Sequence, residues 1–319
     1  MPTRRSFLQS TAAVTAALTG VPALDARLLS LANGPTGTTT PTPKPSTALQ
    51  VPKMKFFDTE ISRMVLGVNP FCGYAHYNNN FSGAMKAWYT PERVCAVMHE
   101  CTRYGINAFN YVALERLPED WLRFVAEGGK MHLIMQVLSN DEDTARLAKT
   151  LKPLAMFRQG EVTDIAYRTG TMDKVRDWCK RVRDMGVIVG VGTHKPEVIS
   201  QIEEEGWDVD FYAGCVYNRT RTREEWKKVL NGEIMEMENE IYVQSDPPRM
   251  YSVMRQTSKP CFAFKILAAG RIADNGIEQA FRTAFSSIKP NDGVLVGMFP
   301  RAKDEVRENA EIVQRILQG

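Results

Sequence analysis

Short apolar runs alternate with longer amphipathic segments along most of the chain. Eight of these runs contain four to six residues each and are rich in valine, isoleucine and phenylalanine, which is typical of buried β-strands. The predicted strands are Met64–Val68, Ala108–Tyr111, Leu133–Val137, Ala155–Gln159, Ile188–Gly192, Phe211–Val216, Cys261–Ile266 and Val294–Gly297. The segments between and after them have the 3.6-residue period of helices, over Pro91–Tyr104, Asp141–Lys149, Thr171–Met185, Lys195–Glu205, Arg223–Leu230, Pro247–Gln256, Gly276–Ser287 and Lys303–Leu317.

Strands that are apolar throughout are buried on both faces, which indicates a parallel sheet covered by helices. Eight strand–helix repeats therefore predict a closed (β/α)8 barrel, the TIM-barrel fold class. Residues 51–319 are close in number to the roughly 250 that one such barrel contains. An open, doubly wound sheet is the alternative, although no Gly-x-Gly-x-x-Gly motif follows the first strand.

The N-terminal segment has the features of an export signal. Arg4 and Arg5 stand before Ser6-Phe7-Leu8, and an uncharged stretch then runs to about Leu24, with Val21-Pro22-Ala23 as a candidate cleavage site. This order resembles a twin-arginine (Tat) signal, which implies recognition by the Tat export machinery and a periplasmic or otherwise exported protein. A chance arginine pair before a buried helix is the alternative. The stretch is too short, and too rich in threonine, to predict a stable membrane span.

The predicted domain organisation is a signal region over 1–32, a Thr/Pro-rich linker over 33–50 and a barrel over 51–319. The whole chain is 44% hydrophobic and 24% charged, as in ordinary globular proteins. Its formal net charge of +3 comes from the first 50 residues, so the predicted barrel is near neutral and lacks the basic field that nucleic-acid binding requires. The six cysteines form no CxxC pair, which favours free buried thiols over disulfides and gives no zinc or iron–sulfur spacing.

Candidate catalytic residues come from the carboxyl ends of the predicted strands, where barrel enzymes place their chemistry. Lys265 lies in the apolar run Phe262–Leu267, where an ammonium group must be paired or neutralised. Desolvation lowers the pKa of such a lysine, which suits a base, a carbonyl-polarising donor or a Schiff-base nucleophile. The alternative is a structural ion pair, with Glu161 as a possible partner.

His194 follows the fifth strand and is the predicted general acid/base, although a hydrogen-bonded structural histidine is the alternative. Glu161 and Asp164 lie three residues apart after the fourth strand. Together with His194 they are candidate ligands of a divalent metal, or partners in acid/base work. In the alternative, Asp164 caps a turn and only Glu161 faces the site.

The long loop after the first strand, over residues 69–81, mixes aromatic and amide side chains. Aromatic faces cover C–H surfaces and amides bond hydroxyls, so the mixture suits a sugar-like small-molecule substrate. A lid packed on the barrel rim is the alternative. The candidate substrate-binding residues at this end of the barrel are Asn69, His76, Asn110, Tyr111, Gln136, Gln159, Tyr217 and Asn218.

Several segments resemble the aldo/keto reductase superfamily of (β/α)8 barrels, which use NAD(P)H. They are Ile61–Gly67, Gly105–Asn110, Val216–Asn218, Ala263–Gly270, the loop at Gly297 and Glu308-Asn309. The resemblance implies NAD(P) as a cofactor, with Arg301, Glu308 and Asn309 as candidate cofactor-binding residues.

The chain departs from that superfamily at its catalytic tetrad of Tyr, Asp, Lys and His. The Asp position is Asn110, the Lys position is Gln136 and the His position is Gln159, while Val112–Arg116 offers no tyrosine. An arginine that grips the cofactor's 2′-phosphate falls on Glu305, which would repel it. The resemblance is therefore to a divergent, exported branch that lacks the tetrad, and standard carbonyl reduction is not expected.

The predicted function is acid/base chemistry of the isomerase, lyase or hydrolase type on a small sugar-like or carbonyl substrate. In this hypothesis His194 moves a proton, Glu161 orients it or acts as partner base, and Lys265 polarises a carbonyl. Two alternatives stay open: an NAD(P)H-dependent oxidoreductase with substituted catalytic residues, and a non-catalytic ligand-binding barrel.

Overall fold

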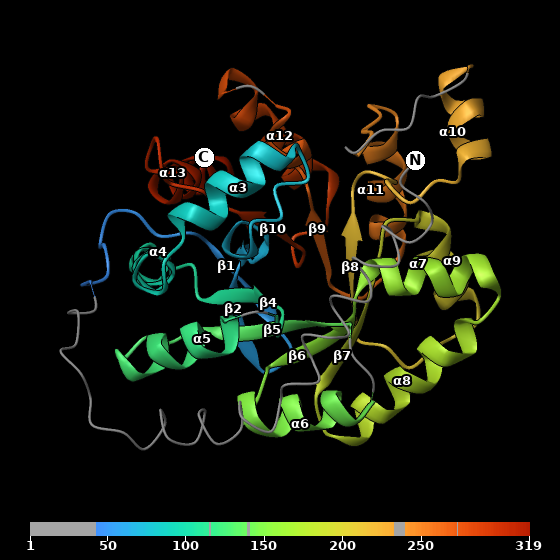
Figure 1. Ribbon diagram of the computed structural model, residues 1–319, viewed down its shortest axis with the longest axis horizontal. Coiled ribbons are helices and arrows are strands. Elements are labelled where there is room, and N and C mark those ends of the chain that lie inside the picture. Colours follow the sequence, from blue (N-terminus) through green and yellow to red (C-terminus); the bar gives the residue numbers. More distant parts are fainter. Residues whose placement is uncertain (1–42, 115, 139–140, 233–239, 273) are drawn as a thin grey trace.

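The structure is a computed structural model that describes residues 43–114, 116–138, 141–232, 240–272 and 274–319. Eight parallel strands form a closed barrel in the order β10-β3-β4-β5-β6-β7-β8-β9 (Figure 1). They are β3 (Met64–Gly67), β4 (Ala108–Tyr111), β5 (His132–Val137), β6 (Ala155–Arg158), β7 (Ile188–Thr193), β8 (Phe211–Cys215), β9 (Cys261–Phe264) and β10 (Gly293–Gly297). All eight predicted strands are confirmed, and the closed order excludes the open sheet.

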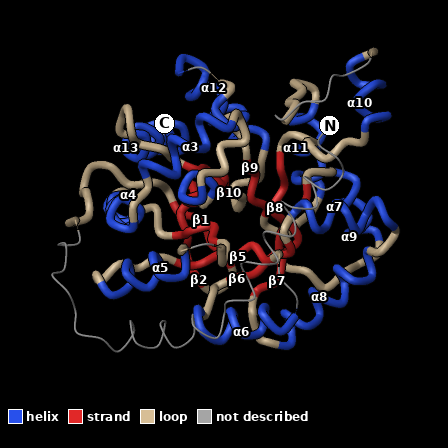
Figure 2. The backbone as a smooth tube through the Cα atoms, in the orientation of Figure 1, coloured by secondary structure: helices blue, strands red, loops and turns tan. Residues whose placement is uncertain are grey.

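Helices surround the barrel on its outer face, as the blue ring around the red strands shows in Figure 2. The helices that the pattern predicted are α4 (Pro91–Arg103), α6 (Asp141–Leu151), α8 (Met172–Asp184), α9 (Pro196–Glu204), α10 (Arg223–Leu230), α11 (Asp246–Gln256), α12 (Asp274–Ser287) and α13 (Glu305–Gln318). Those that it did not predict are α3 (Asn79–Trp88), α5 (Leu117–Ala126) and α7 (Gly160–Thr169), together with the 3-10 turns η1 (Asn69–Cys72) and η2 (Ala268–Gly270).

Helix α7 matters for the site because it carries Glu161 and Asp164. It begins with Gly160 and continues through β-branched residues, all of which have modest helix propensity, so its sequence reads as a loop. The helix is started by Gln159, whose side-chain oxygen accepts a hydrogen bond from the Val162 N–H at 3.1 Å.

Alternate residues of each strand belong to two separate apolar clusters. In β4, Ala108 packs in the cluster inside the barrel, whereas Phe109 and Tyr111 pack in the layer between the strands and the helices. Successive side chains of a strand point to opposite faces, so the strands need apolar residues on both. This explains why they are apolar throughout.

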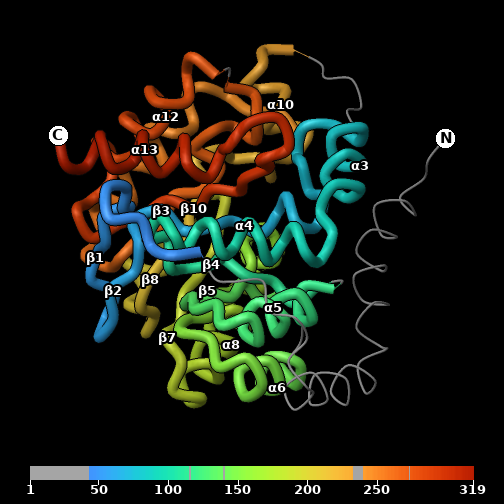
Figure 3. The backbone as a smooth tube through the Cα atoms, turned by 90° about the vertical axis from the view of Figure 1, so that its left-hand side faces the viewer, coloured from blue at the N-terminus to red at the C-terminus, as the bar shows by residue number. Residues whose placement is uncertain are grey.

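A two-stranded antiparallel hairpin, β1 (Lys53–Phe56) and β2 (Thr59–Ser62), supplies the end of the inner cluster. Met54, Phe56 and Ile61 of the hairpin pack with the inner residues of the barrel strands. Figure 3 shows the hairpin at one end of the molecule and α3 toward the other. The hairpin was not predicted, because its four-residue strands contain exposed polar positions that resemble a loop.

Phe56→Ala is expected to lower the free energy of unfolding by about 3–4 kcal/mol, because a buried phenylalanine leaves a cavity that its neighbours fill only partly. Phe56 is fully buried, and its ring lies 5.6 Å from Phe211 and 5.5 Å from Phe262. Urea unfolding measures the effect. The matched control is Phe57→Ala at the adjacent, 38% exposed residue, which should cost less than half as much; equal losses would contradict the burial of Phe56.

The predicted signal region and most of the linker, residues 1–42, lie outside the described residues. The end of the linker packs on α4, since the Ser46 N–H donates to the Arg103 carbonyl at 2.9 Å and the Gln50 side-chain amide donates to the same oxygen at 3.0 Å. Within the described part of the chain, no helix combines the length and apolar character that crossing a bilayer requires.

Candidate functional site

The three predicted catalytic residues lie just beyond strand ends on one side of the barrel. Lys265 directly follows β9, His194 directly follows β7, and Glu161 is in the first turn of α7, which follows β6. All the barrel strands are parallel, so these positions belong to the same carboxyl-terminal mouth.

Glu240 is the centre of the charged network in this mouth, and sequence reasoning missed it. Its Oε1 accepts a hydrogen bond from His76 Nδ1 at 2.7 Å and forms an ion pair with the guanidinium of Arg219, also at 2.7 Å. Its Oε2 accepts from Lys265 Nζ at 2.9 Å and from the Tyr242 hydroxyl at 2.7 Å. The buried ammonium of Lys265 is therefore paired, as expected, but with Glu240 and not with the suggested Glu161.

Arg219 connects Glu240 to the other two predicted catalytic residues. Its Nε donates to His194 Nε2 at 3.1 Å, and a terminal nitrogen donates to Glu161 Oε2 at 3.0 Å. Lys265, His194 and Glu161 are thus joined through Arg219 and Glu240 without contacting one another directly. Arg219 follows Asn218 in the loop after β8, so the rule that selected Asn218 could also have selected Arg219.

Asp164 is a buried partner of His194 and not the cap of a turn. Its Oδ2 lies 2.7 Å from His194 Nδ1, and the hydroxyls of Thr193 and Thr220 donate to the carboxylate at 2.5 and 3.1 Å. Burial would raise the pKa of Asp164, but its hydrogen bonds to His194 and Thr193 outweigh this and keep the pKa below its usual value. Asp164 is therefore a carboxylate anion.

His194 is held as a neutral imidazole with its proton on Nδ1. Nδ1 faces the Asp164 carboxylate, and Nε2 accepts from Arg219, so both ring nitrogens are used. Burial lowers the pKa of His194 more than Asp164 raises it, and the charges of Arg219 and Lys265 lower it further. The side chain is only 3% exposed. His194 thus orients Arg219, and little of its ring is open to a substrate.

The candidate metal ligands do not come together as a ligand set. The Arg219 guanidinium lies between Glu161 and His194 and supplies the positive charge that a metal would bring. Across the residues that the structure describes, no group of three or more His, Cys, Asp or Glu side chains has a metal-binding arrangement. Glu161, Asp164 and His194 are therefore not assigned to a metal.

His76 enters the mouth from the loop after β3, and its position there was predicted. Its Nε2 accepts from the Asn69 side-chain amide at 3.0 Å, while Nδ1 donates to Glu240. Burial lowers the pKa of His76 to about 4, with a further contribution from the charge of Lys265. His76 and Lys265 have φ of 54° and 63°, in the left-handed region that costs a non-glycine residue energy. The surrounding structure therefore holds His76 and Lys265, which both contact Glu240, in this backbone conformation.

The candidate binding residues on β4 and β5 differ in the face of the strand to which they belong. Asn110 and Gln136 follow the inward-facing residues Ala108 and Ile134 by two, so they face the interior at the mouth. Tyr111 was predicted wrongly: it is fully buried in the outer layer, because neighbouring strand residues cannot both face inward.

Gln159 and Asn218 form hydrogen bonds that stabilise neighbouring helices. The Gln159 side chain caps α7, as described above, and the backbone N–H of Asn218 donates to Asp246 Oδ2 at 3.1 Å. The Tyr217 ring packs against Tyr242 at 4.7 Å. In the loop after the first barrel strand, Asn78 caps α3, and Phe81 of α3 packs on Phe299, which follows β10. This segment therefore packs on the barrel rim, as in the alternative that the sequence left open.

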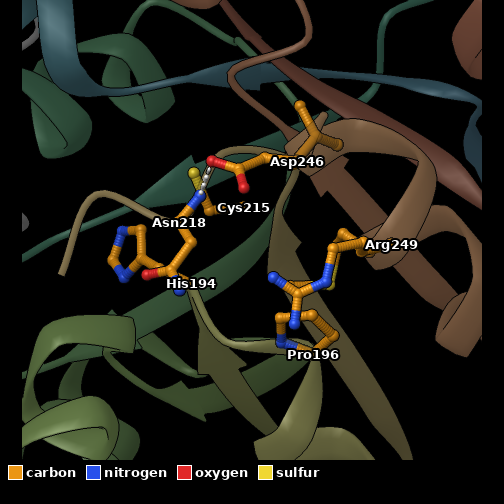
Figure 4. Close-up of a pocket in the computed structure, with 8 residues that line it drawn as sticks. His194, Pro196, Cys215, Asn218, Asp246 and Arg249 are labelled. Carbon is orange, nitrogen blue, oxygen red and sulfur yellow. Dashed lines mark hydrogen bonds between the residues drawn. The ribbon is translucent and has the colours of Figure 1, made fainter. Parts of the chain in front are cut away.

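A recess lies beside His194, at the end of β8 between α9 and α11 (Figure 4). It has an empty volume of about 160 Å³, which includes space open to solvent. Figure 4 shows His194 on one side and Arg249 on the other, with the hydrogen bond from Asn218 to Asp246 above them. Its lining residues are His194, Pro196, Cys215, Val216, Asn218, Asp246, Arg249 and Met250.

The candidate cofactor-binding residues do not form a phosphate site. Arg301 is exposed, Glu308 pairs with Lys303 at 3.1 Å, and Asn309 is buried in α13. The Glu305 carboxylate accepts from the Phe299 N–H at 2.6 Å and so occupies a donor that a phosphate would need. These residues do not fit a nicotinamide dinucleotide.

Comparisons with known proteins give no family. No protein-family model and no curated protein sequence matches the chain significantly. A truncated 3-deoxy-D-arabino-heptulosonate 7-phosphate synthase from Thermotoga maritima is similar in structure, with a TM-score of 0.49, 11% identity and coverage of 84% of this chain and 92% of that one. A sugar phosphate isomerase/epimerase from Parabacteroides distasonis has a TM-score of 0.41 and 12% identity, with coverage of 88% of this chain and 98% of that one. A D-psicose 3-epimerase from Clostridium cellulolyticum has a TM-score of 0.37 and 12% identity, with coverage of 80% of this chain and 91% of that one. Likeness at this level carries no argument about the reaction, and the barrel assignment rests on the strand pairing.

Proposed function

We propose that the chain is an enzyme that moves a proton between neighbouring carbons of a small carbonyl-bearing, sugar-like molecule in the barrel mouth. The observation that supports it is the network through Arg219 and Glu240, which brings a buried ammonium and an accessible carboxylate from separate strand ends to one place. Isomerisation is the simplest such reaction because it needs no other reactant. Assignment to the aldo/keto reductase superfamily stays a proposal that rests on sequence resemblance.

In the proposed mechanism Lys265 donates a hydrogen bond to the substrate carbonyl oxygen. Its side chain is 8% exposed, and its pairing with one carboxylate oxygen, that of Glu240 in the structure, leaves its other N–H groups able to donate. As the proton leaves the adjacent carbon, the C–H electron pair forms a C=C bond and the carbonyl electrons move to oxygen. The resulting enolate oxygen is stabilised by the ammonium of Lys265.

Glu161 is the proposed base that accepts this proton from the hydroxyl-bearing carbon and returns it to the former carbonyl carbon. In the second step the hydroxyl proton passes to the enolate oxygen, so the hydroxyl becomes the new carbonyl and the old carbonyl becomes a hydroxyl. Its side chain is 40% exposed, far more than His194, and one donor from Arg219 orients it. His194 and Asp164 then have a positioning role, because they fix the guanidinium that orients Glu161. This exchanges the roles that the sequence suggested for Glu161 and His194.

Glu161→Gln is expected to slow proton exchange by at least about 100-fold, because the amide cannot accept the proton. The assay incubates aldoses, ketoses and their carboxylic acids with the protein in D₂O and follows deuterium entry beside the carbonyl by NMR. Glu204→Gln, at an exposed glutamate of α9, is the matched control and should exchange at the wild-type rate. Wild-type protein that exchanges no member of the panel, or a Gln variant as fast as wild type, would overturn the proposal.

We also propose export through the Tat pathway, on the strength of Arg4 and Arg5 before the apolar stretch. Changing both arginines to lysine should keep the protein in the cytoplasm of its host, as measured by cell fractionation. Unchanged export would contradict the proposal.

A further inference from the structure

The pocket around the Glu240 carboxylate is built to hold an anion. Its Oε1 accepts a hydrogen bond from His76 Nδ1 at 2.7 Å and lies 2.7 Å from the Arg219 guanidinium in an ion pair. Its Oε2 accepts hydrogen bonds from Lys265 Nζ at 2.9 Å and from the Tyr242 hydroxyl at 2.7 Å. Four polar groups, two of them cations, therefore surround the two oxygens.

Three of these groups, His76, Arg219 and Lys265, come from segments other than that of Glu240, whereas Tyr242 lies two residues after it. His76 is also held by Asn69, Arg219 by His194, and Lys265 by the end of β9. The Tyr242 ring packs between the Arg271 guanidinium at 4.1 Å and Tyr217. Each of these groups therefore has contacts besides the Glu240 carboxylate, and the two cations among them require an anion.

Glu240 differs from the other buried carboxylate of the mouth. Asp164 is part of a helix and is completely buried, whereas Glu240 lies between α10 and α11 and is 17% exposed. Its backbone carbonyl accepts from Arg271 at 2.8 Å, so the backbone is held apart from the carboxylate and the proposal requires only the side chain to leave the pocket. A free carboxylate could then take the same three hydrogen bonds and the ion pair with Arg219.

We propose that this pocket binds the carboxylate of the substrate, and that Glu240 occupies it when no substrate is bound. The inference rests on the proposed function and narrows its substrate to a sugar acid or a similar polyhydroxylated carboxylic acid. In the bound state the substrate carboxylate replaces Glu240 as the partner of one Lys265 N–H group. The other N–H groups of Lys265 still donate to the carbonyl oxygen, in the same mouth as Glu161.

The first test compares acetate with its neutral isostere acetamide on Glu240→Ala, Glu161→Ala and wild-type protein, with thermal unfolding as the readout. Acetate should bind Glu240→Ala at least tenfold more tightly than the other two proteins, and acetamide should not. Glu161→Ala is the matched control because it removes the other carboxylate that Arg219 holds. Equal acetate binding by all three proteins, or equal binding of acetate and acetamide, would overturn the proposal.

The second test needs no variant. D-glucuronate and D-glucose differ at one carbon, and wild-type protein should bind glucuronate at least tenfold more tightly, as measured by calorimetry; equal or weaker binding would overturn the proposal. Both tests measure binding without turnover. Carboxylate binding without deuterium exchange would therefore reject the proposed reaction and support the carboxylate pocket. Deuterium exchange into neutral sugars alone would support the reaction and reject the pocket.

Discussion

Lys265→Met should reduce deuterium exchange into the substrate by about 1000-fold, the largest loss expected from any single change in the mouth. Methionine has a similar length but cannot donate to the carbonyl oxygen, so the enolate loses its main stabilising charge. The measurement is the NMR exchange assay at saturating substrate.

The fold should survive this substitution. An apolar side chain suits the surroundings of Lys265. Glu240 keeps its hydrogen bonds from His76 and Tyr242 and its ion pair with Arg219. Circular dichroism and urea unfolding check this. Lys130→Met, at an exposed lysine before β5, is the matched control and should keep full exchange. A Lys265→Met protein that is folded and still exchanges normally would remove Lys265 from the mechanism.

Lowering the pH from 6.5 to 4 should remove about 3 kcal/mol of stability through His76 alone. The pKa of His76 falls from 6.5 to about 4 on folding, so between these values the unfolded chain binds more protons than the folded one. Stability is then complete above pH 6.5 and is lost as the pH falls. His194, whose pKa is also lowered by burial, adds a loss of the same sign.

Urea unfolding at several pH values measures this dependence, and His76→Asn isolates the contribution of His76. Asparagine tolerates the left-handed backbone at this position better than other residues do. In the variant, the free energy of unfolding should fall less steeply with decreasing pH, by the amount that His76 contributes. The same slope in both proteins would show that His76 does not have a lowered pKa.

The fold could be predicted from the sequence because barrel strands buried on both faces are apolar throughout, and eight of them recur between amphipathic helices. The same reasoning found Lys265, since an ammonium within an apolar run is conspicuous. It failed on Tyr111 because it placed two adjacent strand residues on the same face. It failed on the hairpin because β1 and β2 contain only four residues each.

The partners of the site residues were less predictable. Glu240 lies 25 residues from Lys265 and 164 from His76 along the chain, in a segment with no strand or helix pattern to place it. The sequence grouped Asp164 with His194, but the direct hydrogen bond between them depends on α7, whose glycine and β-branched residues resemble a loop. Local patterns identified which groups need a partner, but the closure of the barrel decides which partner they receive.

The protonation of the imidazoles tests the network most directly. A long-range proton–nitrogen NMR spectrum at pH 7 reports the tautomer of each of the four histidines in the chain. His76 and His194 should be neutral with the proton on Nδ1, facing Glu240 and Asp164, while His99, whose Nε2 lies 3.0 Å from Glu127, should carry it on Nε2. Protons on Nε2 of His76 and His194 would contradict the network that joins Lys265, His194 and Glu161.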